Sequence, residues 1–143
     1  MTSLAFFIGA WACSGVFPSS GKPIASTMTF AGDLSGKAVV KHHDDRPPST
    51  YHAIEIWVYS DTDKRYNAAI ADNFGGIRDF ASPGWQGNAL VWSSEPSIAP
   101  AQQFAYKKLS AESFAVEWRV MRKGIYVVGD TLKCTRVPAT PQR

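Results

Sequence analysis

Cys13 and Cys134 are the only two cysteines in the chain, and their positions bear on both chemistry and architecture. If the segments around them are antiparallel neighbours with Trp11 opposite Arg136, the same register puts Cys13 directly opposite Cys134. A cross-strand disulfide, a buried thiol pair and a reactive thiol are then all open to this pair. Because the two segments lie at opposite ends of the chain, they can be neighbours only if the sheet closes on itself, which predicts a barrel.

The segment 51–59 holds the strongest candidates for acid–base chemistry. It is typical of a strand, and side chains alternate between the two faces of a strand, so His52 and Glu55 point to opposite sides. The pattern leaves open which of them faces inward. An inward His52 is a natural acid–base or hydrogen-bonding group, whereas an inward Glu55 is a candidate base whose pKa burial would raise. A purely structural role for these polar groups is the competing interpretation.

Two other charged groups indicate possible ligand contacts. His42 and His43 precede two aspartates, but adjacent strand residues point to opposite faces, so both imidazoles cannot reach one metal ion without a bulge. We therefore predict a solvated strand end here and no metal site. Asp72, Arg78 and Asp79 flank a Gly-Gly turn, and a charged pair at a barrel rim can contact the carboxylate or phosphate of a ligand.

Aromatic residues make up 13% of the 143-residue chain, and so many rings in a small protein need a physical reason. A cavity lined with rings is one explanation, and a densely packed aromatic core is the other. In the first case, the residues expected to line the cavity are His52, Trp57, Tyr66, Phe80, Trp92, Tyr106, Trp118 and Tyr126. Trp85 lies in a glycine-rich turn and is expected to cover one end of the barrel or to gate its mouth.

The chain as a whole indicates an all-β fold. Short alternating segments are separated by turn residues, which is typical of an antiparallel barrel or sandwich. We predict one domain over 1–143, with a frayed tail at 138–143 and a short helical turn at 3–8. Its architecture is a closed up-and-down barrel of about 8–10 strands. The expected strands are 11–17, 25–31, 38–43, 51–59, 65–72, 76–81, 88–93, 102–108, 113–121 and 125–137.

The last predicted hairpin indicates which side chains face inward. A three-residue loop that ends in Gly124 pairs Met121 with Ile125. That register places Trp118 on the inner face, whereas an even-numbered loop would place charged residues there. Asp130 also falls on the inner face, which we interpret as a bulge or as a polar site within the cavity.

Charge and hydropathy exclude several classes of protein. The net charge of +3 is spread along the chain, without the basic stripe that nucleic-acid binding requires. No apolar stretch approaches the roughly 20 residues of a membrane-spanning helix. The apolar run at 4–11 is short for a signal peptide and lacks a positively charged region before it, which favours a cytoplasmic over a secreted protein. The sequence leaves open whether the protein is a monomer or a homodimer.

Gly9-Ala10-Trp11 and Arg136 resemble the calycin superfamily of lipocalins and fatty-acid-binding proteins. In lipocalins an arginine near the C-terminus packs over that tryptophan at the closed end of the barrel, which contributes about 0.5–2 kcal/mol. More closely, residues 4–137 resemble an uncharacterised family of single-domain bacterial lipocalin-like proteins. The motifs that carry this resemblance are 9–11, 72–75, 82–87 with Leu90 and Trp92, and 135–136. The resemblance implies a barrel, and this fold hosts many functions.

A more distant resemblance is to nitrobindin, a barrel that holds haem. Its opening motif is similar to Gly9-x-Trp11 followed by Gly15, although Cys13 stands where that motif has a glycine. The axial histidine of that family lies towards the C-terminus, whereas no histidine follows His52 here. The sequence therefore departs from the family at the haem ligand itself.

These patterns lead to four functional hypotheses. The first is a barrel that binds a small apolar or aromatic molecule in its interior. The second is a small-molecule cyclase or isomerase that uses His52 or Glu55 as acid and base, and the third is a haem-binding barrel. The fourth is a structural or interaction module with a filled core. The sequence assigns no catalytic residue, metal ligand or cofactor.

Overall fold

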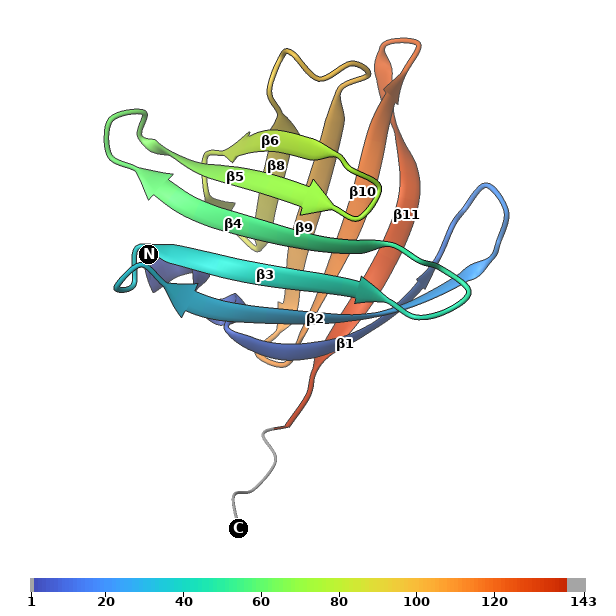
Figure 1. Cartoon of the computed structure of the whole chain (residues 1–143), viewed down its shortest axis with the longest axis horizontal. Helices are drawn as coiled ribbons and strands as arrows, with labels where there is room; N and C mark the ends of the chain where they lie inside the picture. Colours follow the sequence, from blue (N-terminus) through green and yellow to red (C-terminus); the bar gives the residue numbers. More distant parts are fainter. Residues whose placement is uncertain (1, 139–143) are drawn as a thin grey trace.

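The computed structural model describes residues 2–138, so all but the first residue of the predicted frayed tail at 138–143 lies outside the described residues. The chain begins with a 3-10 helix, η1 (Thr2–Phe7), and continues as an antiparallel sheet (Figure 1). The strands are β1 (Gly9–Val16), β2 (Pro23–Asp33), β3 (Ala38–Asp45), β4 (His52–Ser60), β5 (Arg65–Asp72), β6 (Ile77–Ser82), β7 (Trp85–Gln86), β8 (Ala89–Ser94), β9 (Gln102–Ser110), β10 (Ser113–Arg122) and β11 (Ile125–Arg136). Within residues 2–138, no helix is long and apolar enough to cross a membrane.

The sheet closes into a barrel because its two halves meet at both seams. Consecutive strands pair from β1 to β6 and from β8 to β11, and β1 also pairs with β11. Closure comes from β6 and β8, where Phe80 lies opposite Ser94 and Ala81 opposite Ser93. The two-residue β7 adds to the margin of β8, so ten strands of the described chain form the closed barrel. The predicted closed up-and-down barrel with a short N-terminal helical turn is confirmed.

The first and last strands are joined in the register that the sequence indicates. Trp11 lies opposite Arg136, and Cys13 lies opposite Cys134. The two cysteines form a disulfide, which is the cross-strand bond among the alternatives for this pair. The bond spans 121 residues of sequence, and crosslinks that close long loops stabilise small proteins by about 2–5 kcal/mol. It ties the two ends of the chain together across one seam of the barrel.

Helix η1 plugs the end of the barrel at which β1 begins. The Trp11 indole donates a hydrogen bond from Nε1 to the carbonyl oxygen of Phe7 at 2.8 Å. The Arg136 guanidinium lies over the same indole, with Cζ 4.3 Å from the ring centroid, and donates to the carbonyl oxygens of Phe6 and Ile8. These contacts combine cation–π attraction with satisfied backbone acceptors, and they close this end of the barrel.

Aromatic rings fill the space beneath η1. The ring of Phe7 lies 5.3 Å from Trp57, 5.4 Å from Tyr106 and 5.6 Å from Trp85, as measured between centroids. Phe7 and Trp57 are both fully buried. Trp85 lies in β7 and stacks on Phe7. Trp85 is expected from the sequence either to cover one end of the barrel or to gate its mouth, and in the structure it covers the closed end. The interior is therefore packed with side chains at this end.

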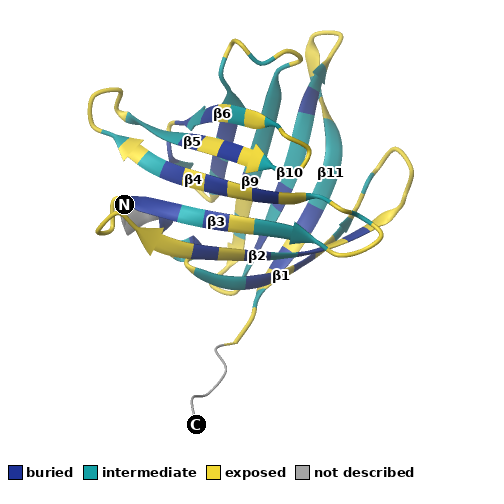
Figure 2. Ribbon diagram, in the orientation of Figure 1, coloured by how far each residue is buried: buried dark blue, intermediate teal, exposed yellow. Residues whose placement is uncertain are grey.

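Alternating burial along the strands identifies the side chains that face the interior (Figure 2). In β2, every second residue from Ile24 to Phe30 is buried, because successive residues of a strand point to opposite faces. The same alternation in β4 points Glu55 and Trp57 inward and leaves His52 exposed. The structure thus decides which face of this segment lines the barrel.

The β10–β11 hairpin differs from the predicted one at its loop. Arg122 pairs with Ile125, so the loop has two residues, Lys123 and Gly124. Both have positive φ angles, 49° and 82°, which is the conformation that two-residue hairpin loops need to match the twist of their strands. The predicted three-residue loop is therefore wrong.

A β-bulge restores the inward facing that the sequence predicts for Trp118. Trp118 lies opposite Asp130 and Arg119 lies opposite Val128, so Gly129 is the extra residue in β11. A Cβ atom at Gly129 would lie 2.5 Å from the indole of Trp118, and only glycine allows that approach. The bulge compensates for the even-numbered loop, and Trp118 and Asp130 both line the interior.

Candidate ligand-binding cavity

A cavity of about 770 Å³ occupies the half of the barrel interior away from η1. Inward-facing side chains of β2, β3, β9, β10 and β11 form its walls, and Phe17, Pro48 and Phe74 belong to loops at its rim. Connections alternate between the two ends of an up-and-down barrel, so these loops lie opposite the plugged end (Figure 1). The volume falls within the range of about 300–1,000 Å³ that is typical of small-molecule pockets.

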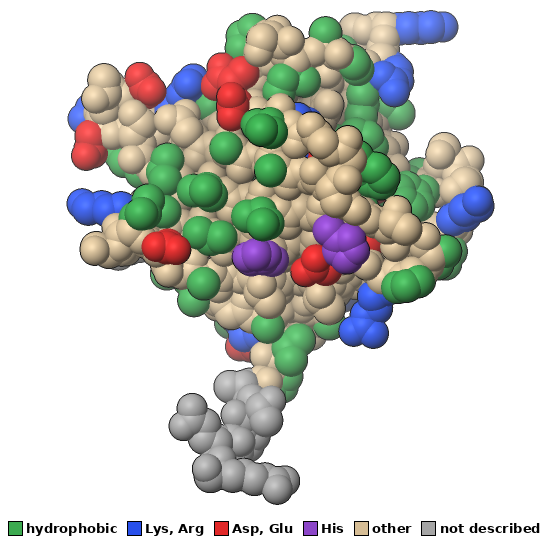
Figure 3. Space-filling view, in the orientation of Figure 1, with side chains coloured by type: hydrophobic (Ala, Val, Ile, Leu, Met, Phe, Trp, Pro, Cys, Tyr) green, Lys and Arg blue, Asp and Glu red, His purple; other side chains and the backbone are tan. Residues whose placement is uncertain are grey.

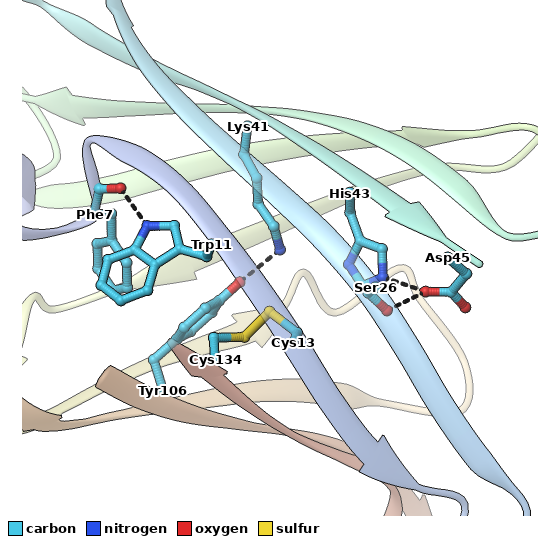
Figure 4. The surroundings of a disulfide bond; sticks show 9 residues. All are labelled: Phe7, Trp11, Cys13, Ser26, Lys41, His43, Asp45, Tyr106 and Cys134. Atoms are coloured by element: carbon cyan, nitrogen blue, oxygen red, sulfur yellow. Dashed lines mark hydrogen bonds and ion pairs between the residues drawn. A yellow bond between two sulfur atoms is a disulfide. The ribbon is translucent and has the colours of Figure 1, made fainter. Parts of the chain in front are cut away.

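The deep side of the cavity holds a buried network of polar groups. Lys41 Nζ donates to Glu55 Oε2 at 2.9 Å and to the hydroxyl oxygen of Tyr106 at 2.8 Å (Figure 4 shows the bond to Tyr106). The Trp57 indole donates to the other carboxylate oxygen of Glu55 at 3.0 Å. Lys41 and Glu55 are cross-strand partners on β3 and β4, so the sheet register brings their charges together. These pairings satisfy charges that would otherwise be costly to bury.

Burial and pairing act in opposite directions on this network. Burial disfavours the ammonium of Lys41, but the Glu55 carboxylate and the Tyr106 oxygen outweigh it and raise the pKa of Lys41. Burial likewise favours neutral Glu55, but the charge and hydrogen bond of Lys41 hold the pKa of Glu55 below its usual value. The pKa of Tyr106 is raised, chiefly by burial. The expectation that an inward Glu55 has a raised pKa is therefore wrong, because Lys41 neutralises its charge.

A second polar cluster lies on the wall formed by β2 and β3. Asp45 accepts a hydrogen bond from the hydroxyl of Ser26 at 2.6 Å, and His43 Nε2 lies 2.7 Å from the same carboxylate (Figure 4). The hydroxyl of Ser49 donates to the other carboxylate oxygen at 2.6 Å. Burial opposes ionisation, but these bonds hold the pKa of Asp45 below its ordinary value. His42 is exposed, as alternation along the strand predicts. In the part of the chain that the structure describes, no three His, Cys, Asp or Glu side chains are grouped to hold a metal ion.

Arg78 organises a third polar cluster. Its guanidinium donates to Gln102 Oε1 at 2.7 Å and to the hydroxyl oxygen of Tyr51 at 3.0 Å, and it lies 3.8 Å from a carboxylate oxygen of Asp72. The Trp118 indole donates to the same oxygen of Gln102 at 3.2 Å. Asp72 and Arg78 thus form a charged pair beside the Gly-Gly turn. Protein groups hold both terminal nitrogens of the guanidinium, while its buried Nε has no hydrogen-bond partner among the described residues.

Asp130 differs from the other charged residues of the cavity. Apart from a hydrogen bond with the backbone of Trp118, it has no ion pair or side-chain hydrogen bond with any residue between 2 and 138. Burial raises its pKa to about 6, with His43 lowering the pKa and the carboxylate of Asp45 raising it further. This carboxyl is therefore ionised at neutral pH and loses its charge in mildly acidic solution.

Some of the rings expected in the cavity line it, and others lie in the packed core. Tyr106 and Trp118 line the cavity, as expected. Three of the expected rings are at most 2% exposed within the core and do not contribute to the cavity lining: Trp57, Phe80 and Trp92. Further rings line the cavity without having been expected there, namely Phe17, Tyr51, Phe74 and Phe104.

The remaining expected residues lie away from the cavity. Tyr66 packs against a neighbouring tyrosine ring at 4.9 Å, and Tyr126 is half-buried near the loop of the β10–β11 hairpin. His52 lies on the outer face, where its imidazole is 51% exposed and pairs with Asp44 at 2.6 Å. Histidine side chains are visible on this surface, over β3 and β4, in Figure 3. The expectation that His52 lines the cavity does not match this placement, because the alternation that points Glu55 inward points His52 outward.

Lys41 and Phe104 belong to the cavity although neither is among the residues expected there. Asp45 and His43 also line it, with side chains 7% and 13% exposed, so the predicted solvated strand end is wrong for these two residues. A signal was present for Lys41, since it shares a strand face with apolar Val39 and lies opposite Glu55 once the β3–β4 hairpin is paired. Asp45 follows two residues after His43 on the same face. For Phe104 no local pattern separates a cavity ring from a core ring.

No model of a known protein family matches the chain, and no curated protein sequence matches it. The ten-stranded barrel is compatible with a calycin-like or lipocalin-like fold. Evidence for the function of this protein therefore comes from the geometry and chemistry of the cavity.

Proposed function

We propose that this protein binds a small molecule with an apolar or aromatic body inside the barrel. The observation that carries the proposal is the cavity of about 770 Å³, closed at one end by packed rings and lined by aliphatic and aromatic side chains. Met28, Val116 and Leu132 supply aliphatic surface, and Tyr106 and Trp118 supply rings. The resemblance to lipocalin-like proteins supports the same interpretation.

The polar groups of the cavity support binding because most of them already have partners. Lys41 is engaged by Glu55, and Asp45 is engaged by Ser26. A ligand therefore does not have to replace these hydrogen bonds, and burial of its apolar surface can drive binding. Polar groups that hold each other in place also keep the cavity shape defined before the ligand enters.

The contacts favour binding over the enzyme and haem hypotheses. His52 lies outside the barrel, and Lys41 and Trp57 occupy both carboxylate oxygens of Glu55. A general base needs an oxygen or nitrogen within hydrogen-bond reach of the substrate. The imidazole of His43 faces the cavity but is bonded to Asp45 through Nε2, which occupies a nitrogen that haem iron would need.

Fluorescence titration with N-phenyl-naphthylamine, a neutral dye that brightens in apolar surroundings, tests the proposal. We expect saturable binding by the wild-type protein and at least tenfold weaker binding by Val116→Trp, because the added ring would fill the cavity from β10. Ile54→Trp is the matched control, since Ile54 lies on the outer face of β4 and is 48% exposed. This control is expected to bind the dye like the wild type.

Two results would contradict the proposed function. One is the absence of saturable dye binding by the wild-type protein, and the other is equal binding by wild type and a correctly folded Val116→Trp variant. Circular dichroism establishes the fold of each variant. Native mass spectrometry of the purified protein provides a second readout, because a small-molecule adduct that disappears on denaturation identifies the mass of a bound ligand.

A further inference from the structure

We propose that the ligand carries a cationic amine, which pairs with the Asp130 carboxylate while its apolar body packs against the aromatic wall of the cavity. This inference rests on the proposed function, since it concerns a molecule bound in the same cavity. The pairing of charges in the cavity, the bulge in β11 and the rings around the mouth each point to this class of ligand.

Among the charged side chains in the cavity wall that the structure describes, the half-buried Asp130 is the exception to a pattern of pairing. The pairs within ion-pair distance are Lys41–Glu55, His43–Asp45 and Arg78–Asp72. Lys22 also reaches the cavity rim, but it is exposed and makes no ion pair with Asp130. An ionised Asp130 therefore has no cation of the protein within ion-pair distance, and a bound cation would compensate its charge.

The bulge in β11 directs this carboxyl into the cavity. Without the bulge, the two-residue hairpin loop would place Gly129 opposite Trp118. The side chain of Asp130 would then point to the outer face of the barrel. With it, Asp130 lies between the inward-facing side chains of Trp118 and Leu132, which are both apolar and offer no counter-charge. The titratable groups that act on Asp130 from β3 are His43, Asp45 and Lys41. All three already have partners of their own.

Aromatic side chains around the same cavity suit an ammonium group as well as an apolar body. Phe17, Tyr51, Phe104 and Trp118 all line it. The faces of such rings attract cations, and the attraction increases where water is excluded. A wall of rings with one carboxylate therefore offers two favourable contacts to an alkylammonium group and apolar contact to the carbon chain attached to it.

An anionic ligand fits this arrangement less well. The cations Lys41 and Arg78 are engaged by carboxylates of the protein, so they offer less attraction to a further negative charge. A ligand carboxylate placed near Asp130 and Asp45 would meet two groups of its own sign. The charge of the ligand is therefore the property that this cavity should discriminate.

Competition against the bound dye separates the classes of ligand. Phenylpropylamine, phenylpropanol and phenylpropanoate share one apolar body and present a cation, a neutral hydroxyl and an anion. At neutral pH we expect the wild-type protein to bind the amine at least about tenfold more tightly than the alcohol, with the carboxylate weakest.

Two variants locate the origin of that preference. Asp130→Asn keeps the shape of the side chain and removes its charge, so amine and alcohol should bind within about twofold of each other. Asp79→Asn removes an exposed carboxylate from the outer face of β6 and should keep the full preference for the amine. Asp130→Asn should fold at least as well as the wild type, because it removes an unpaired charge from a half-buried position.

The outcomes separate this inference from the proposed function. Failure of the dye to bind the wild-type protein overturns the proposed function and the amine inference with it. Dye binding without an amine preference, or with a preference that persists in Asp130→Asn, overturns the amine inference alone. Should Asp130→Asn not fold, the ranking on the wild-type protein decides, since any order in which the amine is not first contradicts the inference.

Discussion

The two ends of the barrel interior are built by the same strands but differ in packing and in charge. At the η1 end, Phe7, Trp11 and Trp57 are at most 1% exposed, and their rings contact one another or neighbouring rings. At the other end, the strands enclose a cavity of about 770 Å³ with charged groups in its walls. The contrast indicates that stability is concentrated in the packed half, and the proposed binding would use the hollow half. Substitutions in the two halves should therefore separate these properties.

The change from packed to hollow occurs within individual strands. In β3, Val39 belongs to the core, Lys41 lies at the boundary and His43 faces the cavity. In β10, Phe114 belongs to the core and Trp118 lines the cavity. Successive inward positions on a strand are about 7 Å apart, so the interior changes from packed core to cavity over only a few side chains.

The largest expected effect comes from breaking the packed end. Trp11→Ala removes a buried indole together with its hydrogen bond to Phe7 and its contact with Arg136. We expect the free energy of unfolding, measured by urea denaturation, to fall by about 3–5 kcal/mol. Ile77→Ala, at a side chain that is 78% exposed, is the control and should change it by less than about 0.5 kcal/mol. Equal losses for the two variants would mean that the packed end does not hold the barrel together.

The next effect tests the boundary between the two halves. Glu55→Gln leaves the charge of Lys41 buried without a counter-ion, so the free energy of unfolding should fall by about 3 kcal/mol. Adding Lys41→Met should recover part of this loss, because no charge then remains buried. A double variant that is less stable than Glu55→Gln alone would contradict this explanation.

The same pair has a defined pH dependence. Lys41 holds the folded-state pKa of Glu55 below its usual value, so the stabilisation is present above the ordinary carboxyl pKa and is lost as the pH falls through the lower, folded-state value. The difference in unfolding free energy between wild type and Glu55→Gln should therefore shrink in strongly acidic solution. Urea denaturation at neutral and acidic pH measures it.

At the cavity end we expect a gain in stability. Burial raises the pKa of Asp130 from 3.8 to about 6, so the wild-type protein loses stability as the pH rises between these values. Asp130→Asn removes this loss and should be more stable than the wild type at neutral pH by up to about 3 kcal/mol, with no difference below the unfolded-state pKa. Thermal unfolding over a series of pH values tests this. A variant less stable than the wild type at neutral pH would indicate that the carboxylate stabilises the fold.

The smallest effect is expected outside the barrel. His52→Ala removes an ion pair with Asp44 in which both side chains are about half exposed, so the free energy of unfolding should change by less than about 0.5 kcal/mol. Dye affinity should not change, because the imidazole lies on the opposite side of the sheet from the cavity. A clear loss of dye binding in this variant would contradict the outward placement of His52.

The closure of the barrel could be predicted from the sequence because antiparallel pairing is restrictive. Once Trp11 lies opposite Arg136, every other pair in β1 and β11 is determined, including Cys13 with Cys134. The β10–β11 hairpin shows where this reasoning fails. A bulge at Gly129 changes the register within the hairpin, so the inward facing of Trp118 could be predicted while the loop length could not.

The polar contacts of the cavity could not be predicted, because they join residues that are distant in sequence. Lys41 and Tyr106 are 65 residues apart and meet only when the barrel closes. Periodicity also gives two faces for 51–59 without saying which is buried, and a charged residue such as Glu55 argues against burial unless its partner is known. The partner, Lys41, is itself a residue that is seldom fully buried.

Tryptophan indole N–H signals in a proton–nitrogen NMR spectrum test most directly whether a ligand binds in the hollow half and leaves the packed half unchanged. Trp118 lines the cavity, whereas Trp11 is buried beneath η1. During titration with N-phenyl-naphthylamine, we predict that the Trp118 signal shifts to saturation while the Trp11 signal keeps its position. A shift of Trp11 without one of Trp118, or no shift of either at high dye concentration, would contradict binding in this cavity.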